Sequence, residues 1–285
     1  MNAYADLRRR LARRVADAHA PLSPWIGLVS GSTVEDAADA RSDVDMSLLF
    51  AAPPPEAALR EACLAAGGEP WHWQVGSFDG SGAVVAFRLQ GIEVQIGYGS
   101  RANFESEMDQ VLVRHDPDTP LHKVCEGVAK AEPLAGAEAL AAVQARLALF
   151  PDGLGRAMAA HWLGRPTPWR AIVQIVHRDA LVWSRELQVE AAYRLLGALA
   201  GLNGRFFTTF QFKRMGRFVD ALAVRPPAFA ARLEAVLMTP PGPGFAALHA
   251  LEAEVVALVA ARWPDLDLDE VRRRHAAFTA ADAGA

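Results

Sequence analysis

The chain has 285 residues, of which 52% are hydrophobic, and a formal net charge of −4 at pH 7. This length allows one large domain or two smaller ones, and the hydrophobic content is sufficient for a packed core. The acidic balance argues against a broad nucleic-acid-binding surface and is compatible with a small or cationic substrate.

The first twenty residues predict an amphipathic helix, because Leu7, Leu11 and Val15 recur at helical spacing among five arginines. The segment lacks the apolar core of a secretory signal, and its apolar stripe is too thin for a membrane-surface helix. We find no run that is long and apolar enough to span a bilayer, so we expect no membrane partner. Two cysteines without metal-ligand spacing, Cys63 and Cys125, indicate unpaired thiols in a reducing cytoplasm.

Strands and helices alternate over the next eighty residues. The patterns predict a strand over 25–30, a short helix over 33–40, a second strand over 44–50 and a helix over 56–66. A third strand over 71–78 ends at a turn at Asp79-Gly80. Residues 83–89 and 92–98 then predict a hairpin that turns at Gln90-Gly91.

Strand signals fade after Arg101, and the remaining sequence is rich in Ala, Leu and Arg. Helices are predicted near 137–150, 169–186, 189–202, 211–223, 227–238 and 244–262. This change predicts an α+β fold with two domains. Residues 1–125 would form a mixed β-sheet flanked by helices, and residues 126–285 an all-helical domain.

The most informative motif joins Gly31-Ser32, after the first strand, to Asp43 and Asp45 at the start of the second. Side chains alternate along a strand, so the two aspartates point the same way and offer carboxylate oxygens to a divalent cation. A Gly-Ser turn after a strand offers backbone N–H groups to a phosphate. Metal and phosphate together indicate a nucleoside triphosphate and phosphoryl or nucleotidyl transfer.

The ordered set of apolar strand, Gly31-Ser32-Thr33, spacer and Asp43-Val44-Asp45 resembles the signature of the polymerase-β-type nucleotidyltransferase superfamily, over roughly the first third of the chain. The superfamily includes antibiotic nucleotidyltransferases, which also have a catalytic domain followed by helices. The resemblance implies that Asp43 and Asp45 bind Mg²⁺ and that Gly31 and Ser32 hold the phosphates. It also implies transfer of a nucleoside monophosphate, by default AMP from ATP, to a hydroxyl of a small acceptor.

The superfamily usually places a third carboxylate on a neighbouring strand, where it acts as the general base. Here Glu93 and Gln95 share one face of the candidate strand. With Glu93 in that position the catalytic set of Asp43, Asp45 and Glu93 is complete. With Gln95 there the base is missing, because a neutral amide does not accept a proton. The alternative function is therefore a catalytically degraded nucleotide-binding or protein-interaction module.

One further candidate lies in the helical half, where a segment rich in aromatic and basic residues contains Lys213 and Arg214. We expect Lys213 to bind the triphosphate, and the alternative is a set of core aromatics with surface cations beside them. His72 and His161 lack partners at ligand spacing, which argues against a zinc site. A kinase-like phosphotransferase is disfavoured because its glycine-rich loop is missing.

Overall fold

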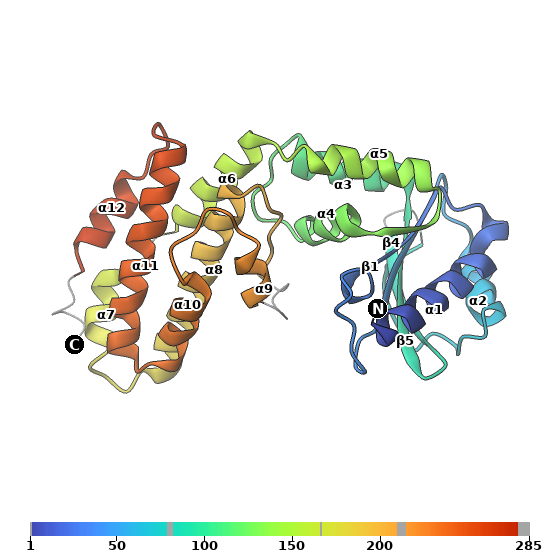
Figure 1. Cartoon of the computed structure of the whole chain (residues 1–285), viewed down its shortest axis with the longest axis horizontal. Coiled ribbons are helices and arrows are strands. Elements are labelled where there is room, and N and C mark those ends of the chain that lie inside the picture. The colour runs from blue at the N-terminus through green and yellow to red at the C-terminus, as the bar shows by residue number, and fades with distance from the viewer. Residues whose placement is uncertain (1, 79–81, 166, 210–214, 279–285) are drawn as a thin grey trace. The chain divides into compact units, whose positions relative to one another are not determined.

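The computed structural model describes residues 2–78, 82–165, 167–209 and 215–278. The chain forms two compact units, of which the first contains Met1–Val113 with Val124–Leu149 and the second contains Arg114–Lys123 with Phe150–Ala285. The predicted α+β class is confirmed, with a mixed sheet in the first unit and helices throughout the described part of the second (Figure 1). The expected boundary after residue 125 falls inside helix α4 (Leu121–Lys130).

The first unit is built on a six-stranded sheet in the order β3-β4-β5-β2-β1-β6. Its strands are β1 (Ile26–Ser30), β2 (Val44–Phe50), β3 (Trp73–Ser77), β4 (Gly82–Leu89), β5 (Ile92–Ser100) and β6 (Glu132–Ala135). The β2–β5 pair is parallel and the other four pairs are antiparallel. The motif strand β2 therefore lies inside the sheet, with a neighbour on each side.

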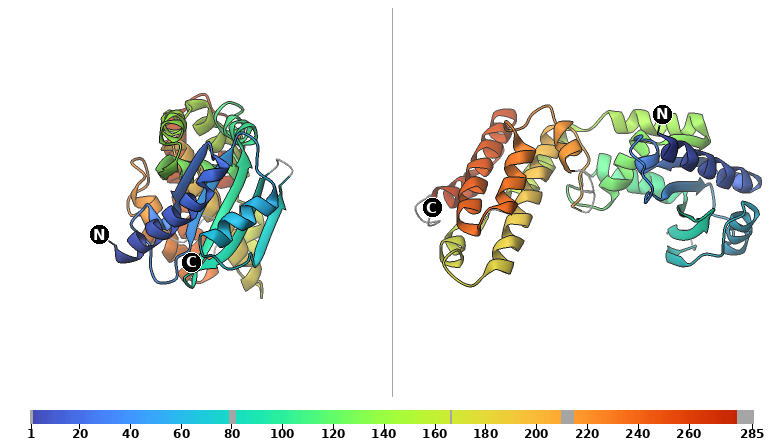
Figure 2. Two further views of the ribbon diagram at one scale, coloured as in Figure 1. Left: turned by 90° about the vertical axis from the view of Figure 1, so that its right-hand side faces the viewer. Right: turned by 60° about the horizontal axis from the view of Figure 1, so that its bottom comes forward.

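Helices of the first unit pack against this sheet. They are α1 (Ala3–His19), α2 (Glu56–Ala65), α3 (Arg101–Leu112), α4 and α5 (Ala137–Ala148), with short 3₁₀ segments at Ala20–Leu22 and Gly31–Thr33. Val44, Met46 and Ile96 are buried in one core with residues of α1 and α2, which lie on the same side of the sheet (Figure 2). The alternate residues Asp45 and Gln95 thus point to the opposite side, here called the polar face.

Two expected helices differ from the structure, and β6, α3 and α4 of the first unit were not expected. The helix expected over 33–40 is absent, because the 3₁₀ segment ends at Thr33 and Asp36 has a positive φ of 55°. Strand β6 was missed, since four residues that include Pro133 give a weak strand signal. The helix expected over 169–186 is broken into α7 (Trp169–Ile175) and α8 (Leu181–Leu202), although no Gly or Pro marks the break.

The described part of the second unit is helical, as expected. Besides α7 and α8 it contains α6 (Asp152–Leu163), α9 (Met215–Asp220), α10 (Phe229–Met238), α11 (Pro241–Arg262) and α12 (Asp269–Ala276). Buried Glu252 of α11 accepts hydrogen bonds from Thr167 Oγ1 at 2.6 Å and from Trp169 Nε1 at 3.2 Å. These bonds satisfy a carboxylate that would otherwise be costly to bury.

Helix α11 corrects the expectation that no run is long and apolar enough to cross a membrane. Within the described residues, this 22-residue helix meets that criterion by length and composition, with a mean hydropathy of 1.6 over its best window. One such helix is weak evidence for a membrane span, because the core helix of a soluble protein passes the same test. Phe245, Leu248 and Leu251 of α11 are fully buried in the unit.

Candidate functional site

The turn after β1 lies against the second aspartate of the motif. Gly31 has a φ of +66°, a conformation that side chains with a Cβ rarely adopt. A Cβ atom at this position would lie 2.4 Å from Asp45 Oδ2 and 3.3 Å from Asp45 Cγ. The backbone of the Gly-Ser turn and the Asp45 carboxylate therefore share one small space, which only a glycine leaves open.

Thr33 of the same turn carries an unsatisfied polar group. Its side chain is fully buried, and its Oγ1 atom has no hydrogen-bond partner in the part of the chain that the structure describes. Buried hydroxyls without a partner are rare in native proteins and call for an explanation, such as an ion or water that completes the site. Ser32, the preceding residue, is half-buried and remains available to a ligand.

Strand register brings the other candidate residues together on the polar face. Asp45 of β2 is paired with Gln95 of β5, and Val44 with Val94, so Asp43 lies level with Glu93. The amide Nε2 of Gln95 donates to Glu93 Oε1 at 2.9 Å and to Asp43 Oδ2 at 3.4 Å. Gln95 thus links Asp43, the first aspartate of the motif, to Glu93, the one glutamate of β5. Glu93 and Gln95, the two candidates for the position of the third carboxylate, therefore both lie beside the motif.

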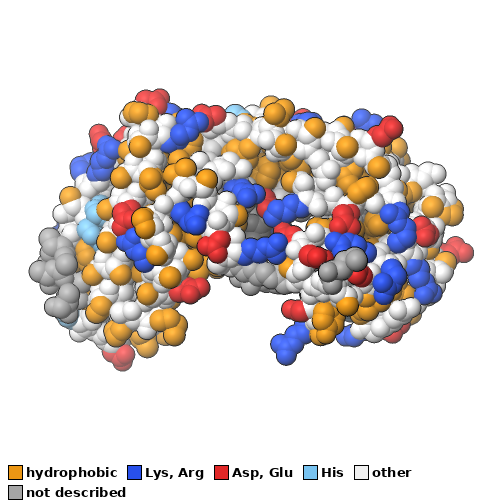
Figure 3. Space-filling model, viewed as in Figure 1, with side chains coloured by type: hydrophobic (Ala, Val, Ile, Leu, Met, Phe, Trp, Pro, Cys, Tyr) orange, Lys and Arg blue, Asp and Glu red, His pale blue; other side chains and the backbone are white. Residues whose placement is uncertain are grey.

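Glu93 also contacts residues beyond the strand pair. Its Oε2 lies 3.4 Å from His72 Nε2, and Arg88 of β4 is its partner in the antiparallel register. Asp43 and Glu93 line one polar hollow of about 300 Å³, together with residues 40–42, Arg88 and residues 91–92. The hollow therefore offers two carboxylates and two guanidinium groups to a polar ligand. On the face seen in Figure 3, basic and acidic side chains are intermixed, with no broad basic surface.

The donor set determines which cation the site fits. No group of three or more His, Cys, Asp and Glu side chains that could hold a metal ion occurs among the described residues. Asp43 and Asp45 supply two carboxylates on one side of β2, and Gln95 supplies a neutral amide. Mg²⁺ commonly binds through one or two carboxylates together with substrate phosphates and water. These residues fit a magnesium ion that is bound jointly by protein carboxylates and a phosphate. They do not fit an ion that is held by protein ligands alone.

A compact turn presents Asp43 to the site. Asp39 Oδ1 accepts a hydrogen bond from the backbone N–H of Arg41 at 2.8 Å, and Ser42 Oγ accepts one from the backbone N–H of Asp39 at 2.9 Å. Aspartate and serine favour such local bonds to the backbone. The chain therefore enters β2 from a self-bonded turn, while the Arg41 side chain is exposed.

Sequence reasoning missed one cation near the Gly-Ser turn and predicted another that lies outside the described residues. The latter is Lys213. The missed residue is Lys130 of α4, whose Nζ lies 2.8 Å from Glu35 Oε1 and 2.6 Å from Glu126 Oε1. Glu35 is itself tied to the turn, because its N–H donates to the Gly31 carbonyl at 3.3 Å. Burial opposes the charge of Lys130, but its bonds to both glutamates outweigh burial and raise its pKa.

The chain was compared with known proteins. No protein-family model matches it, and no curated protein matches it. Among solved structures, it is similar to a nucleotidyltransferase-like protein from Exiguobacterium sibiricum 255-15, with 14% sequence identity and a TM-score of 0.45. The alignment covers 93% of this chain and 79% of the other. A similarity at this level assigns no role to any residue, so the roles below depend on the geometry of this chain.

Proposed function

We propose that the chain is a nucleotidyltransferase that binds a nucleoside triphosphate with Mg²⁺ on the polar face of the sheet. The observation that carries the proposal is the contact between the two halves of the motif, in which a Cβ at Gly31 would lie 2.4 Å from Asp45 Oδ2. A turn that can bind phosphate and a carboxylate that can bind metal are thus adjacent. The orphaned Thr33 hydroxyl supports the same location for a ligand.

Each residue of the site has a chemical role in this proposal. Asp43 and Asp45 would hold Mg²⁺, and the turn at Gly31 and Ser32 would hold the β- and γ-phosphates. The bound metal would supply electrostatic stabilisation of the phosphate oxygens. Glu93 would accept the proton of an acceptor hydroxyl as that oxygen bonds to the α-phosphorus, and pyrophosphate would leave. ATP and a small acceptor in the cytoplasm are the default expectation.

A second candidate, a nucleotide-binding module without transfer activity, is favoured by the position of Gln95. This residue, and no carboxylate, lies level with Asp45 in the strand register. Its amide also donates to both Asp43 and Glu93, so the two carboxylates are already engaged with each other through a neutral group. Such a site keeps two metal ligands, Asp43 and Asp45. Its Glu93 carboxylate is bound to Gln95 and is therefore not free to accept a proton from an acceptor hydroxyl.

Pyrophosphate release distinguishes the two candidates. Wild-type protein is incubated with ATP, Mg²⁺ and a panel of small hydroxyl acceptors, and the Asp43→Asn variant serves as the inactive control. Release of pyrophosphate by the wild type, with none by Asp43→Asn, supports the transferase. Metal-dependent ATP binding without release on any acceptor supports the module, and absence of ATP binding with any divalent cation contradicts both.

A further inference from the structure

Helix α1 contains an arginine that is buried without an acidic partner. Arg8 is 1% exposed, and its guanidinium donates to the Ser42 carbonyl oxygen through Nε at 2.8 Å and through Nη2. Its Nη1 donates to the Tyr4 carbonyl oxygen at 3.0 Å. It forms no ion pair with any carboxylate of the described residues. Arginine is almost never fully buried unless it is paired, so this placement needs a reason.

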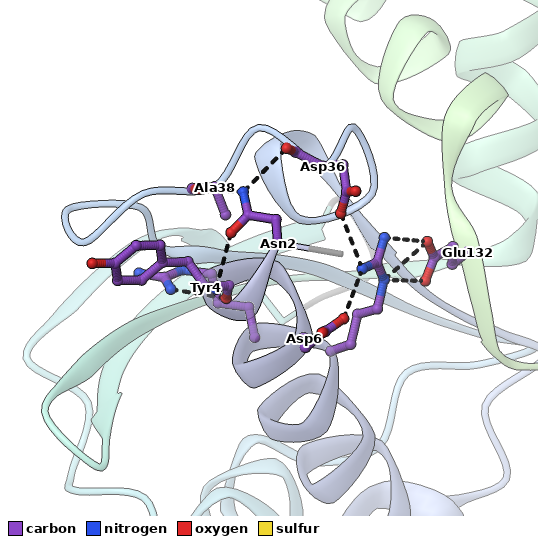
Figure 4. A network of polar contacts seen from close by, with 8 residues as sticks. Asn2, Tyr4, Asp6, Asp36, Ala38 and Glu132 are labelled. Carbon is purple, nitrogen blue, oxygen red and sulfur yellow. Dashed lines mark hydrogen bonds and ion pairs between the residues drawn. The ribbon is translucent and has the colours of Figure 1, made fainter.

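Two residues near Arg8, Asn2 at the N-cap of α1 and Arg9 within it, bind the same loop, which joins the Gly-Ser turn to Asp43. Asn2 Nδ2 donates to the Asp36 carbonyl at 3.1 Å and to the Ala38 carbonyl at 2.8 Å (Figure 4). Arg9 lies 3.5 Å from Asp36 Oδ1 and 2.9 Å from Glu132 Oε1. The loop lacks the helix that the sequence predicts, and α1 instead supplies partners for its backbone at three positions.

The bond to Ser42 has a direct geometric effect on Asp43. The Ser42 carbonyl belongs to the peptide plane that also contains the N–H and Cα atoms of Asp43, and this plane is rigid. A guanidinium that donates two N–H groups to one oxygen restricts the tilt of that plane. The same plane fixes the N–Cα bond of Asp43, from which its side chain extends.

We propose that Arg8 is a positioning residue that orients Asp43 for the ligand of the polar face. The helix before the motif thus contributes to the site through Arg8. The orientation of the Ser42–Asp43 peptide by Arg8 is independent of the bound ligand. Its consequence for metal and nucleotide binding rests on the proposed function.

Three variants of the full-length chain test this role. Arg8→Met removes the charge and all three hydrogen bonds, and Arg8→Lys keeps a charge but replaces the planar fork by a single ammonium. Arg10→Met is the matched control, because Arg10 is an exposed arginine of the same helix. Hydrogen exchange of the amides of residues 36–43 reports the loop directly. Titration with ATP and Mn²⁺ or Mg²⁺ reports the site.

We expect faster exchange of residues 36–43 in both Arg8 variants, with unchanged exchange in β4 and β5. We also expect an about 10–100-fold loss of metal-dependent ATP affinity, the usual effect of removing a residue that orients a metal ligand. Arg10→Met leaves both readouts at wild-type values. If the amides of residues 36–43 exchange at the wild-type rate in folded Arg8→Lys, the proposal is overturned. If Arg8→Met does not fold, Arg8→Lys alone decides the question. A wild-type protein that binds no ATP contradicts the proposed function, while the exchange result still tests Arg8.

Discussion

The contact between Gly31 and Asp45 gives the most quantitative prediction. In Gly31→Ala, the new methyl group would lie 2.4 Å from Asp45 Oδ2, whereas ordinary contacts begin near 3.4 Å. The carboxylate must therefore move by about 1 Å, the difference between these two distances. Misplacement of a reacting group by this amount costs up to about 10²-fold in rate. A single added methyl group should therefore cause a severe functional defect.

The same substitution also carries a backbone cost, which a matched control measures. Gly31 and Gly67 both have positive φ values, +66° and +82°, but the nearest atoms to a Cβ at Gly67 belong to the end of the exposed Arg14 side chain, which can move away. A residue with a Cβ in the left-handed region costs about 1–2 kcal/mol. Gly67→Ala should therefore show this loss of stability with normal ligand binding. Gly31→Ala should show at least the same loss, together with weakened binding.

Urea unfolding measures the stability of both variants, and titration with ATP and Mg²⁺ at a temperature where both are folded measures binding. We expect Gly31→Ala to bind ATP at least about ten times more weakly than Gly67→Ala, in line with the about 10–100-fold cost of disturbing a metal ligand's surroundings. Equal ATP affinity in the two folded variants would refute the reasoning, since it would place the phosphate or the metal away from this contact.

Three further predictions follow from single contacts. Asp43→Asn should abolish pyrophosphate release. The temperature of thermal unfolding should stay near that of the wild type, because the half-buried Asp43 carboxylate contributes to the site and not to the core. Unchanged release would exclude Asp43 as a metal ligand. Glu93→Gln should lower turnover by about 10²–10⁴-fold with ATP affinity retained if Glu93 is the base; if the protein is the inactive module, the change is silent and Gln95→Glu raises release. Burial lowers the pKa of His19, whose Nε2 lies 2.9 Å from the Tyr98 hydroxyl, so the unfolded chain binds its proton more readily. Stability should then fall as the pH drops below about 6.5, by up to about 1.4 kcal/mol per pH unit, and His19→Gln should reduce that slope in urea unfolding from pH 8 to 5; an identical slope would contradict this.

Local patterns were sufficient to predict the elements that carry the motif. The strand expected over 44–50 is β2, Val44–Phe50, because alternating apolar residues and the aspartate pair define both its face and its start. The hairpin at Gln90-Gly91 is also confirmed, since both residues have the positive φ values that such a turn requires. The α+β class followed from the loss of strand signals after Arg101.

Contacts between distant segments were not predictable in the same way. The parallel register that pairs Asp45 with Gln95 depends on how β5 is placed beside β2, and no local pattern encodes that alignment. In place of the helix expected over 33–40, the loop has its Asp36 and Ala38 carbonyls bound by Asn2, more than thirty residues away in the sequence. Tertiary contacts outweigh a weak helix propensity. Lys130 was missed for the same reason, as it reaches Glu35 from α4.

Calorimetric titration of the full-length chain with a non-hydrolysable ATP analogue tests the central claim most directly. The titration is run in Mg²⁺ and in a chelator, with the wild type and with Asp45→Asn, whose carboxylate adjoins the Gly31 turn. The account predicts binding by the wild type in Mg²⁺, loss of that binding in chelator, and loss in folded Asp45→Asn under both conditions. Equal binding by both proteins, with and without the metal, would contradict a nucleotide site built on this motif.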